Sequence, residues 1–254
     1  METATLAIEA AVEERHWWFV GRRRLLSRLM RSYRIPPHAS VLDLGTGTGS
    51  NLRLLKRLGY ERIVGVDANE EAIRFCAEKG LGMVQRADAC HLPFEKDRFR
   101  MILATDILEH VEDDHRALSE LARVLVPGGT AILTVPAFRS LWGLQDRVAH
   151  HKRRYRMRPL LHLIRASGLV CHERFYFNYL LFVPIWLGRQ VIRIFRIPLA
   201  SENQVNTPWL NRLLTWLFLL DVWSARWLHV PFGVSIAAVV VKPSASHVGA
   251  ARHH

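Results

Sequence analysis

A glycine-rich segment at residues 41–51, VLDLGTGTGSN, constrains the fold more than any other part of the chain. Gly45, Gly47 and Gly49 lie between a short apolar run, expected to be a strand, and a segment expected to be a helix. Glycine is favoured where the chain turns sharply and a ligand approaches bare backbone. The spacing is G-x-G-x-G, because Ser50 stands where the dinucleotide-binding pattern requires a third glycine. The segment therefore predicts a strand–turn–helix unit with a ligand at the turn.

Strands and helices are predicted to alternate along the chain, which indicates a parallel sheet with helices on both faces. The expected strands are residues 40–44, 62–66, 82–86, 101–105, 130–135, 169–176 and 234–241. Helices are expected at residues 51–58, 70–78, 113–125 and 159–166, and Pro127-Gly128-Gly129 is expected to stop the third of these. The predicted fold class is α/β, a Rossmann-like doubly wound sheet.

The 254 residues suit one large domain, or one domain that carries a substantial insertion. Residues 1–37 are expected to be helical, with an aromatic break at residues 16–19, and either to form a lid over the ligand or to pack on the sheet. Residues 38–244 form the main domain, with a helical, apolar insertion at about 177–230 before the last strand. Residues 245–254 are expected to be a disordered tail.

Three acids follow consecutive predicted strands. Asp67 ends the second strand and is placed to accept both hydroxyls of a ribose, while Asp88 follows the third strand and is placed to bind an adenine amino group. Asp43 ends the first strand and is expected to hold the loop or the ammonium group of a cofactor. A nucleoside cofactor without a pyrophosphate fits this spacing, which favours S-adenosylmethionine over NAD.

The successive motifs resemble those of class I S-adenosylmethionine-dependent methyltransferases. They are VLDLGTGTGSN, VGVDANEEAI, ADACHLPF, FRMILATDILEHVEDD and LARVLVPGGTAILTVP, in this order. The resemblance implies a seven-stranded sheet whose last strand, residues 234–241, is antiparallel. It implies S-adenosyl-L-methionine as cofactor, bound by Asp43, Gly45, Thr46, Gly47, Gly49, Asp67, Ala68, Asp88, Ala89, Thr105 and Asp106.

The ends of the chain resemble a narrower subgroup, similar to methyltransferase types 11 and 23, that carries an HxRRY motif. Here the matching segments are HWWF at residues 16–19, HKRRY at 151–155 and PFGVS at 231–235. Some members of this subgroup look associated with polyprenol or cell-surface glycan pathways. The resemblance thus implies a small-molecule acceptor that is lipid-linked or a glycan.

Methyl transfer from a sulfonium needs alignment of acceptor and methyl group, and needs a base when the acceptor is protonated at neutral pH. The predicted catalytic residues are His151, Tyr155 and His110. For His110 and its neighbour Glu109, hydrogen bonding at a helix start is the favoured structural interpretation. The predicted substrate-binding residues are Arg153, Arg154 and Trp18, and a solvated basic face is the alternative for the two arginines.

The insertion lacks the run of roughly 18–20 apolar residues that spans a bilayer. Arg189, Arg193 and Arg196 are expected on one helical face, and an amphipathic helix of this kind can lie in a membrane interface. Tryptophans would suit the same interface: Trp209, Trp216, Trp223 and Trp227. A peripheral membrane surface, a substrate cap and a homodimer interface remain open as roles for the insertion.

A net charge of +12 favours an anionic partner, whether nucleic acid, an acidic membrane surface or a phosphorylated substrate. Three separated cysteines fit a reducing compartment, and the acidic start of the chain is unlike a secretory signal, so a cytoplasmic location, including the inner face of the membrane, is expected. No zinc-binding spacing is found, so no metal is predicted.

An RNA methyltransferase and a non-catalytic S-adenosylmethionine-binding scaffold are kept as alternative functions. Nucleic acid is the less favoured acceptor because no appended RNA-binding module is recognisable.

Overall fold

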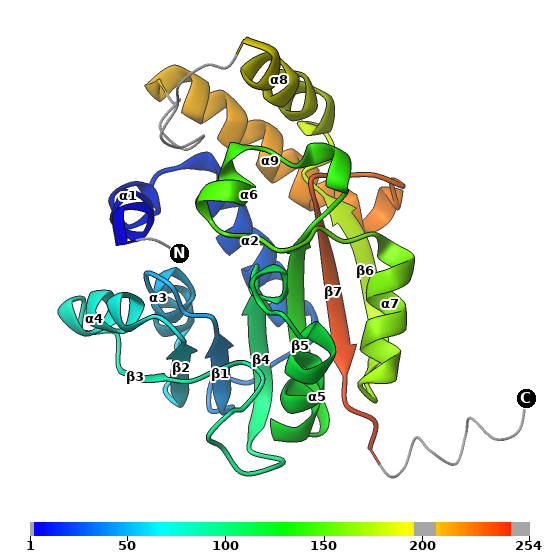
Figure 1. Cartoon of the computed structure of the whole chain (residues 1–254). Coiled ribbons are helices and arrows are strands. Elements are labelled where there is room, and N and C mark those ends of the chain that lie inside the picture. The colour runs from blue at the N-terminus through cyan, green and yellow to red at the C-terminus, as the bar shows by residue number, and fades with distance from the viewer. Residues whose placement is uncertain (1–2, 196–206, 245–254) are drawn as a thin grey trace, which may run out of the picture.

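A seven-stranded sheet forms the centre of the molecule in a computed structural model, which describes residues 3–195 and 207–244 (Figure 1). The strand order is β3-β2-β1-β4-β5-β7-β6, and β7 is antiparallel to both of its neighbours. The strands are β1 (Val41–Leu44), β2 (Ile63–Asp67), β3 (Met83–Arg86), β4 (Phe99–Thr105), β5 (Leu125–Pro136), β6 (Val170–Phe177) and β7 (Ser235–Val241). The predicted fold class is confirmed, including the antiparallel last strand. The disordered tail predicted for residues 245–254 lies outside the described residues.

Helices cover both faces of this sheet. One apolar core joins the sheet to α5 (Asp114–Val124) and α7 (Met157–Ala166). A second core joins the other face to α2 (Trp17–Ser32), α3 (Ser50–Arg57) and α9 (Pro208–Leu228). Helix α4 (Glu70–Glu78) packs beside β3, and a small apolar cluster of Leu52, Cys76 and Leu81 joins it to α3. The parallel strands therefore end at one edge, above which the remaining short elements gather (Figure 1).

The second of the N-terminal helices, α2, packs on one face of the sheet. Helix α1 (Thr3–Val12) is separated from α2 by residues 13–16. The break between the helices thus lies earlier than the predicted residues 16–19, and the aromatic residues 17–19 form the first turn of α2. The ring of Trp18 stacks on Phe218 of α9 at 5.4 Å and on Phe177 of β6 at 6.1 Å. These contacts hold Trp18 against β6 and α9, which supports packing on the sheet, while substrate binding by Trp18 and a lid formed by the aromatic rings stay predictions.

Helix α5 ends at Val124, before Pro127-Gly128-Gly129, and β5 runs through that sequence. The predicted end of the helix at residue 125 is confirmed to within one residue, whereas the strand predicted from residue 130 begins earlier, at Leu125. Pairing with β4 jumps from Phe99↔Leu125 to Met101↔Thr130, so residues 126–129 form an irregularity that proline does not disrupt. A side chain at Gly129 would come within 2.7 Å of the Val126 carbonyl, which explains a glycine here.

The described part of the insertion contains two helices, α8 (Phe182–Phe195) and α9. Asp221 of α9 accepts hydrogen bonds from the backbone amides of Asn178, Tyr179 and Leu180, which fixes the turn that leads into α8. None of the helices in the described ranges combines the length and the apolar character needed to cross a bilayer.

Arg189 and Arg193 of α8 both contact the loop that follows β5, as their spacing on one helical face allows. Arg189 donates to the carbonyl of Leu141, and Arg193 donates to the carbonyl of Trp142. These acceptors belong to η2 (Arg139–Leu141) and the residue after it, next to α6 (Leu144–Val148). Arg196 lies outside the described residues. The backbone carbonyls of the loop above the sheet attract the guanidinium groups, and the apolar side of α8 is left facing outward.

Candidate active site

A cavity of about 470 Å³ lies at the carboxyl edge of β1, β2, β3 and β4. Its lining residues are Leu44, Gly45, Val66, Asp67, Ala68, Ala87, Asp88, Ala89, Cys90, His91, Ile107, His110, Val111, Glu112, Asp113 and Arg116. Six predicted site residues are in this list: Gly45, Asp67, Ala68, Asp88, Ala89 and His110. The cavity therefore joins the ends of consecutive strands, as expected for ligands of open α/β sheets.

The glycine turn forms one wall of this site. Gly45, Gly47 and Gly49 have φ values of +78°, +54° and +83°. Residues other than glycine are strained in this left-handed region. A side chain at Gly49 would also meet Leu81 at 2.2 Å, whereas a Cβ at Gly47 would meet nothing within 4 Å. Gly49 is therefore needed for packing, and Gly47 leaves space above the turn.

Asp67 holds the turn in place. One carboxylate oxygen accepts the backbone N–H of Gly47 at 2.8 Å, and the other accepts that of Asn69 at 2.9 Å. A carboxylate has lone pairs for further donors, so these bonds orient Asp67 without exhausting its capacity. Asp88 is exposed and accepts the N–H of Cys90 at 2.9 Å. Both acids thus present fixed acceptors to the cavity.

A cluster of buried polar side chains lies beside the turn, at the ends of β1 and β4. Asn51 donates to Asp43 and to the hydroxyl of Thr105, both at 2.9 Å. The second oxygen of Asp43 and the side-chain oxygen of Asn51 are buried without a hydrogen-bond partner. Burial raises the pKa of Asp43 to about 6. Unsatisfied buried polar atoms are uncommon and indicate a site for a ligand or water.

Arg22 of α2 adds a positive charge to the same place. It forms an ion pair with Asp106 at 2.9 Å, while its Nε is buried without a partner. Asp106 has a φ of +53° and accepts a hydrogen bond from Thr134, so its carboxylate is fixed at a strained backbone position. Arg22 and Asn51 were missed in the sequence, because only the folded chain brings α2 and the first turn of α3 to these acids.

A second polar group, on the side of β4 and β5, contains His110 and His151. Their rings meet edge to face at 4.7 Å. The Nδ1 of His151 lies 2.9 Å from Asp146 Oδ1, and its Nε2 lies 4.0 Å from Glu109 Oε1. Burial, together with His151, lowers the pKa of His110 to about 4. His110 is therefore neutral at pH 7, and His151 is oriented by a carboxylate.

Glu109 is fully buried in η1 (Leu108–His110), and neither of its side-chain oxygens has a hydrogen-bond partner. Burial, reinforced by the charge of Asp106, raises its pKa well above the ordinary value. The interpretation of Glu109 as a hydrogen-bonding residue at a helix start is wrong. The N-cap of α5 is instead Asp113, whose side chain accepts the N–H of Arg116.

Two of the residues predicted in the HKRRY segment have structural contacts. Arg154 is almost fully buried and pairs with Asp146 through two nitrogens, at 2.7 and 3.0 Å. Tyr155 is buried, and its hydroxyl donates to Asp114 at 2.8 Å; burial raises its pKa. These contacts support a structural role for both residues, and substrate binding by Arg154 and catalysis by Tyr155 stay predictions. Arg153 is half-buried and pairs with Asp114 at 2.8 Å.

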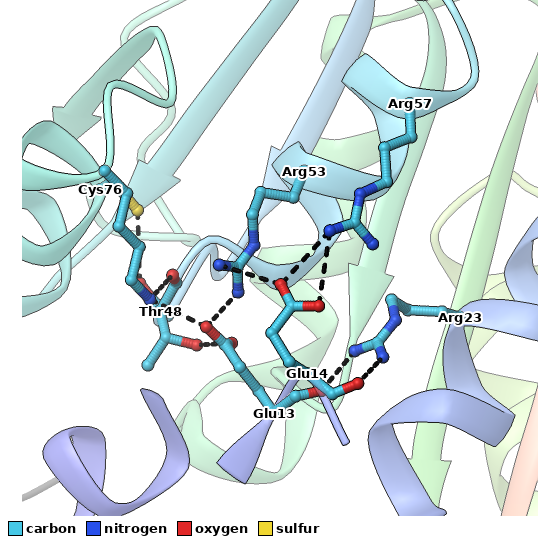
Figure 2. Close-up of polar contacts among 9 residues, drawn as sticks. Glu13, Glu14, Arg23, Thr48, Arg53, Arg57 and Cys76 are labelled. Atoms are coloured by element: carbon cyan, nitrogen blue, oxygen red, sulfur yellow. Dashed lines mark hydrogen bonds and ion pairs between the residues drawn. The ribbon is translucent and has the colours of Figure 1, made fainter. Parts of the chain in front are cut away.

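The segment between α1 and α2 is tied to the glycine turn (Figure 2). Glu13 has no exposed surface and accepts hydrogen bonds from Thr48, Arg53 and Lys79. The adjacent Glu14 is exposed and pairs with Arg53 at 3.2 Å. Glu13 was missed because nothing in the local sequence distinguishes it from its neighbour. The N-terminal segment thus holds the turn from outside the sheet.

Comparison with known sequences agrees with this geometry. A methyltransferase domain model matches residues 42–133. A demethylmenaquinone methyltransferase of Staphylococcus carnosus is 30% identical over 124 residues, which are 44% of this chain and 52% of the relative. A tRNA (carboxymethyluridine(34)-5-O)-methyltransferase of Arabidopsis thaliana is 31% identical over 104 residues, which are 40% of this chain and 25% of the relative. The chain thus spans about half, or less, of the length of these relatives.

The fold is also found among solved structures. A chain from the complex between the Haloferax volcanii Trm112 methyltransferase activator and a methyltransferase matches with a TM-score of 0.64 at 22% identity. The match covers 94% of this chain and 95% of that one. The similarity extends well beyond residues 42–133 and concerns the fold.

Proposed function

We propose that the chain is a class I methyltransferase that transfers the methyl group of S-adenosylmethionine to a small-molecule acceptor. The observation that carries this proposal is the fixed pair of acids at the cavity, Asp67 against the glycine turn and Asp88 on the next strand end. Asp67 offers acceptors to ribose hydroxyls, and Asp88 offers one to an adenine amino group.

The buried polar atoms beside the turn suit the amino-acid end of the same cofactor. Asp43 and Asp106 provide negative charge for an ammonium group, and Arg22 provides positive charge for a carboxylate. S-adenosylmethionine supplies an electrophilic methyl group on a sulfonium. The contribution of the chain is to fix the cofactor and to align the acceptor with that methyl group.

The acceptor is proposed to bind on the side of His110 and His151. His110 lines the cavity, and Asp146 orients His151 behind it. In the tautomer that donates its Nδ1 hydrogen to Asp146, His151 carries a lone pair on Nε2 and can take a proton from an acceptor hydroxyl. Arg153 is a candidate from the HKRRY segment for contact with an acidic acceptor.

The class of acceptor is proposed to be lipid-linked. An exposed stripe of large apolar side chains follows α9 at alternating spacings of four and three residues: Trp209, Leu213, Trp216, Leu220, Trp223 and Trp227. Arginines lie beside Trp223 in a surface depression of about 630 Å³ that includes Arg24, Arg28 and Arg57. Indole rings next to positive charge suit an anionic lipid interface.

The test is transfer of label from methyl-tritiated S-adenosylmethionine to separate lipid and RNA fractions of a cell extract. Label in the lipid fraction, lost at least a hundredfold in His151→Ala, is the expected result. Label in RNA would favour the second candidate, an RNA methyltransferase, which the net charge of +12 and the tRNA-modifying relative support. Cofactor binding without transfer to any fraction would favour a non-catalytic scaffold.

A further inference from the structure

Three side chains with metal-binding atoms converge beneath the cavity. Glu109 and His110 come from η1, after β4, and His151 comes from the loop after α6. One ligand atom from each lies within 4.8 Å of the others. Backbone bonds fix the two segments against each other, since the N–H of Lys152 donates to the carbonyl of Glu109 at 2.8 Å.

Glu109 is the independent observation that indicates a ligand. It is fully buried, yet neither oxygen has a hydrogen-bond partner. An unsatisfied buried carboxylate is costly, so a structure that retains one provides a partner for it. The nearest imidazole nitrogen, His151 Nε2, is 4.0 Å away, which is too long for a hydrogen bond. Ligand atoms around a tetrahedral zinc ion, at about 2.1 Å from the metal, lie roughly 3.4 Å apart.

The surroundings of His151 are those of a metal ligand. Its Nδ1 is engaged by Asp146 at 2.9 Å, so Nε2 is the nitrogen left facing Glu109. Asp146 is held in turn by Arg154. A carboxylate that orients the second nitrogen of a liganding histidine is a recurring feature of zinc sites.

We propose that Glu109, His110 and His151 bind a divalent transition-metal ion of the zinc class. Two imidazoles and one carboxylate leave a coordination position open. Because His110 lines the cavity, that position faces the acceptor side. Where the proposed methyl transfer holds, an acceptor hydroxyl bound at the open position would have a lowered pKa and would release its proton to water, so His151 would not be needed as a base. The binding of the ion itself does not depend on that function.

No metal-binding motif in the sequence indicates this site. Two of its ligands, Glu109 and His110, are adjacent residues after one strand, and the third, His151, follows about forty positions later. The prediction of no metal was based on local motifs alone.

The test is a calorimetric titration of the chelator-treated, dialysed full chain with Zn²⁺, and a titration with Co²⁺ followed by visible absorption. One ion per chain is expected, with a dissociation constant of about micromolar or lower. Glu109→Gln and His151→Asn should each weaken binding at least a hundredfold. Asp146→Asn should weaken it about tenfold to a hundredfold. His162→Asn, on the exposed side of α7, and a double His253→Ala/His254→Ala variant should bind like the wild type.

Absence of binding to the wild type would overturn the proposal, as would binding that persists unchanged in Glu109→Gln and His151→Asn. Circular dichroism establishes that each variant is folded. If a variant fails to fold, the Co²⁺ spectrum of the wild type decides: intense bands of a four- or five-coordinate ion support the site, and a weak hexa-aqua spectrum overturns it. S-adenosylhomocysteine binding is measured separately, so failure of the metal site and failure of the proposed function are distinguishable.

Discussion

At the residue scale, several ionisable side chains are buried, and most of them have a hydrogen-bond or ion-pair partner. His16 is an example outside the site. It is the N-cap of α2, and its Nδ1 accepts the backbone N–H of Trp18 at 3.3 Å. Burial lowers its pKa from 6.5 to about 4. The cap therefore requires the neutral imidazole, because a protonated ring has no acceptor.

His16 makes folding pH-dependent. Its pKa in the folded state is below that of the unfolded state, so its stabilising effect is complete above pH 6.5 and is lost as the pH falls toward 4. The shift corresponds to a loss of at most about 3 kcal/mol across that window. His16→Asn keeps a capping oxygen that does not titrate. Urea unfolding at pH 7, 6, 5 and 4.5 should show a smaller decline in unfolding free energy for this variant than for the wild type.

The control for this prediction is His38→Asn, since His38 is exposed and lies outside the helices and strands. Equal slopes of stability against pH in the wild type and His16→Asn would show that the buried imidazole does not carry the effect.

Residues whose role follows from a strand end or a turn could be read from the sequence. The three glycines of the turn and Asp67 are of this kind, because local spacing alone puts them at the edge of the sheet. Asn51, Glu13 and Glu109 could not be identified in this way. Their importance depends on burial and on partners from distant segments, and a carboxylate looks the same in a sequence whether it is solvated or enclosed.

At the element scale, the connection between α1 and α2 is held by charge rather than by an apolar core. Glu13 joins the glycine turn, α3 and the end of α4 through Thr48, Arg53 and Lys79 (Figure 2). Glu14 reaches α3 only from the solvent side. The two adjacent glutamates therefore differ in burial while sharing a helix partner.

This difference gives a matched pair of variants. Glu13→Gln should lower the unfolding free energy by about 1–3 kcal/mol, because Arg53 and Lys79 lose a buried counterion. Glu14→Gln should cost less than about 0.5 kcal/mol, since exposed pairs contribute little. Guanidinium unfolding at pH 7 measures both values. Equal losses in the two variants would contradict a specific role for Glu13.

The order of the elements was predictable, whereas the orientation of the inserted helices was not. Alternating apolar runs and turns fixed the strands in sequence, because their periods are local properties. The spacing predicts one helical face for Arg189 and Arg193, and both of them bind backbone carbonyls, those of Leu141 and Trp142. Periodicity shows which residues share a helical face. It does not show which face packs against the rest of the protein when one face carries arginines and the other carries large apolar side chains.

At the scale of the whole molecule, two surfaces are candidates for binding: the cavity at the carboxyl edge of the sheet and the exposed apolar stripe of α9. The cavity lies at the carboxyl edge, whereas α9 packs beside α2 and β6, and α8 contacts η2 (Figure 1). Trp216 and Trp227 of α9 are 62% and 75% exposed, while Phe218 on the opposite side of the helix is buried. An exposed apolar stripe of this length is unusual for a monomer and indicates an interaction surface.

A variant of this stripe tests its assignment to a lipid interface. Trp216→Gln/Trp223→Gln/Trp227→Gln should reduce partition onto anionic phosphatidylglycerol vesicles at least tenfold, because each indole that enters the interface contributes about 1–2 kcal/mol. Flotation at low salt measures the bound fraction. Met83→Gln is the control, since Met83 is equally exposed but lies on β3 at the other end of the sheet.

Failure of the wild-type chain to float would contradict the lipid assignment. A dimer detected by light scattering and dissolved by the triple variant would assign the stripe to a second copy of the chain instead.

The most direct measurement for the central claim is calorimetric titration of the chain with S-adenosylhomocysteine, alongside NAD and ATP. The predicted result is one site for S-adenosylhomocysteine with a dissociation constant of about micromolar, equivalent to about −8 kcal/mol, and no heat from NAD or ATP. Asp67→Ala should weaken binding at least tenfold, while Glu61→Gln, exposed and outside the cavity, should leave it unchanged. Binding of NAD in place of the thioether nucleoside, or no binding of the thioether nucleoside at all, would contradict the proposal of methyl transfer.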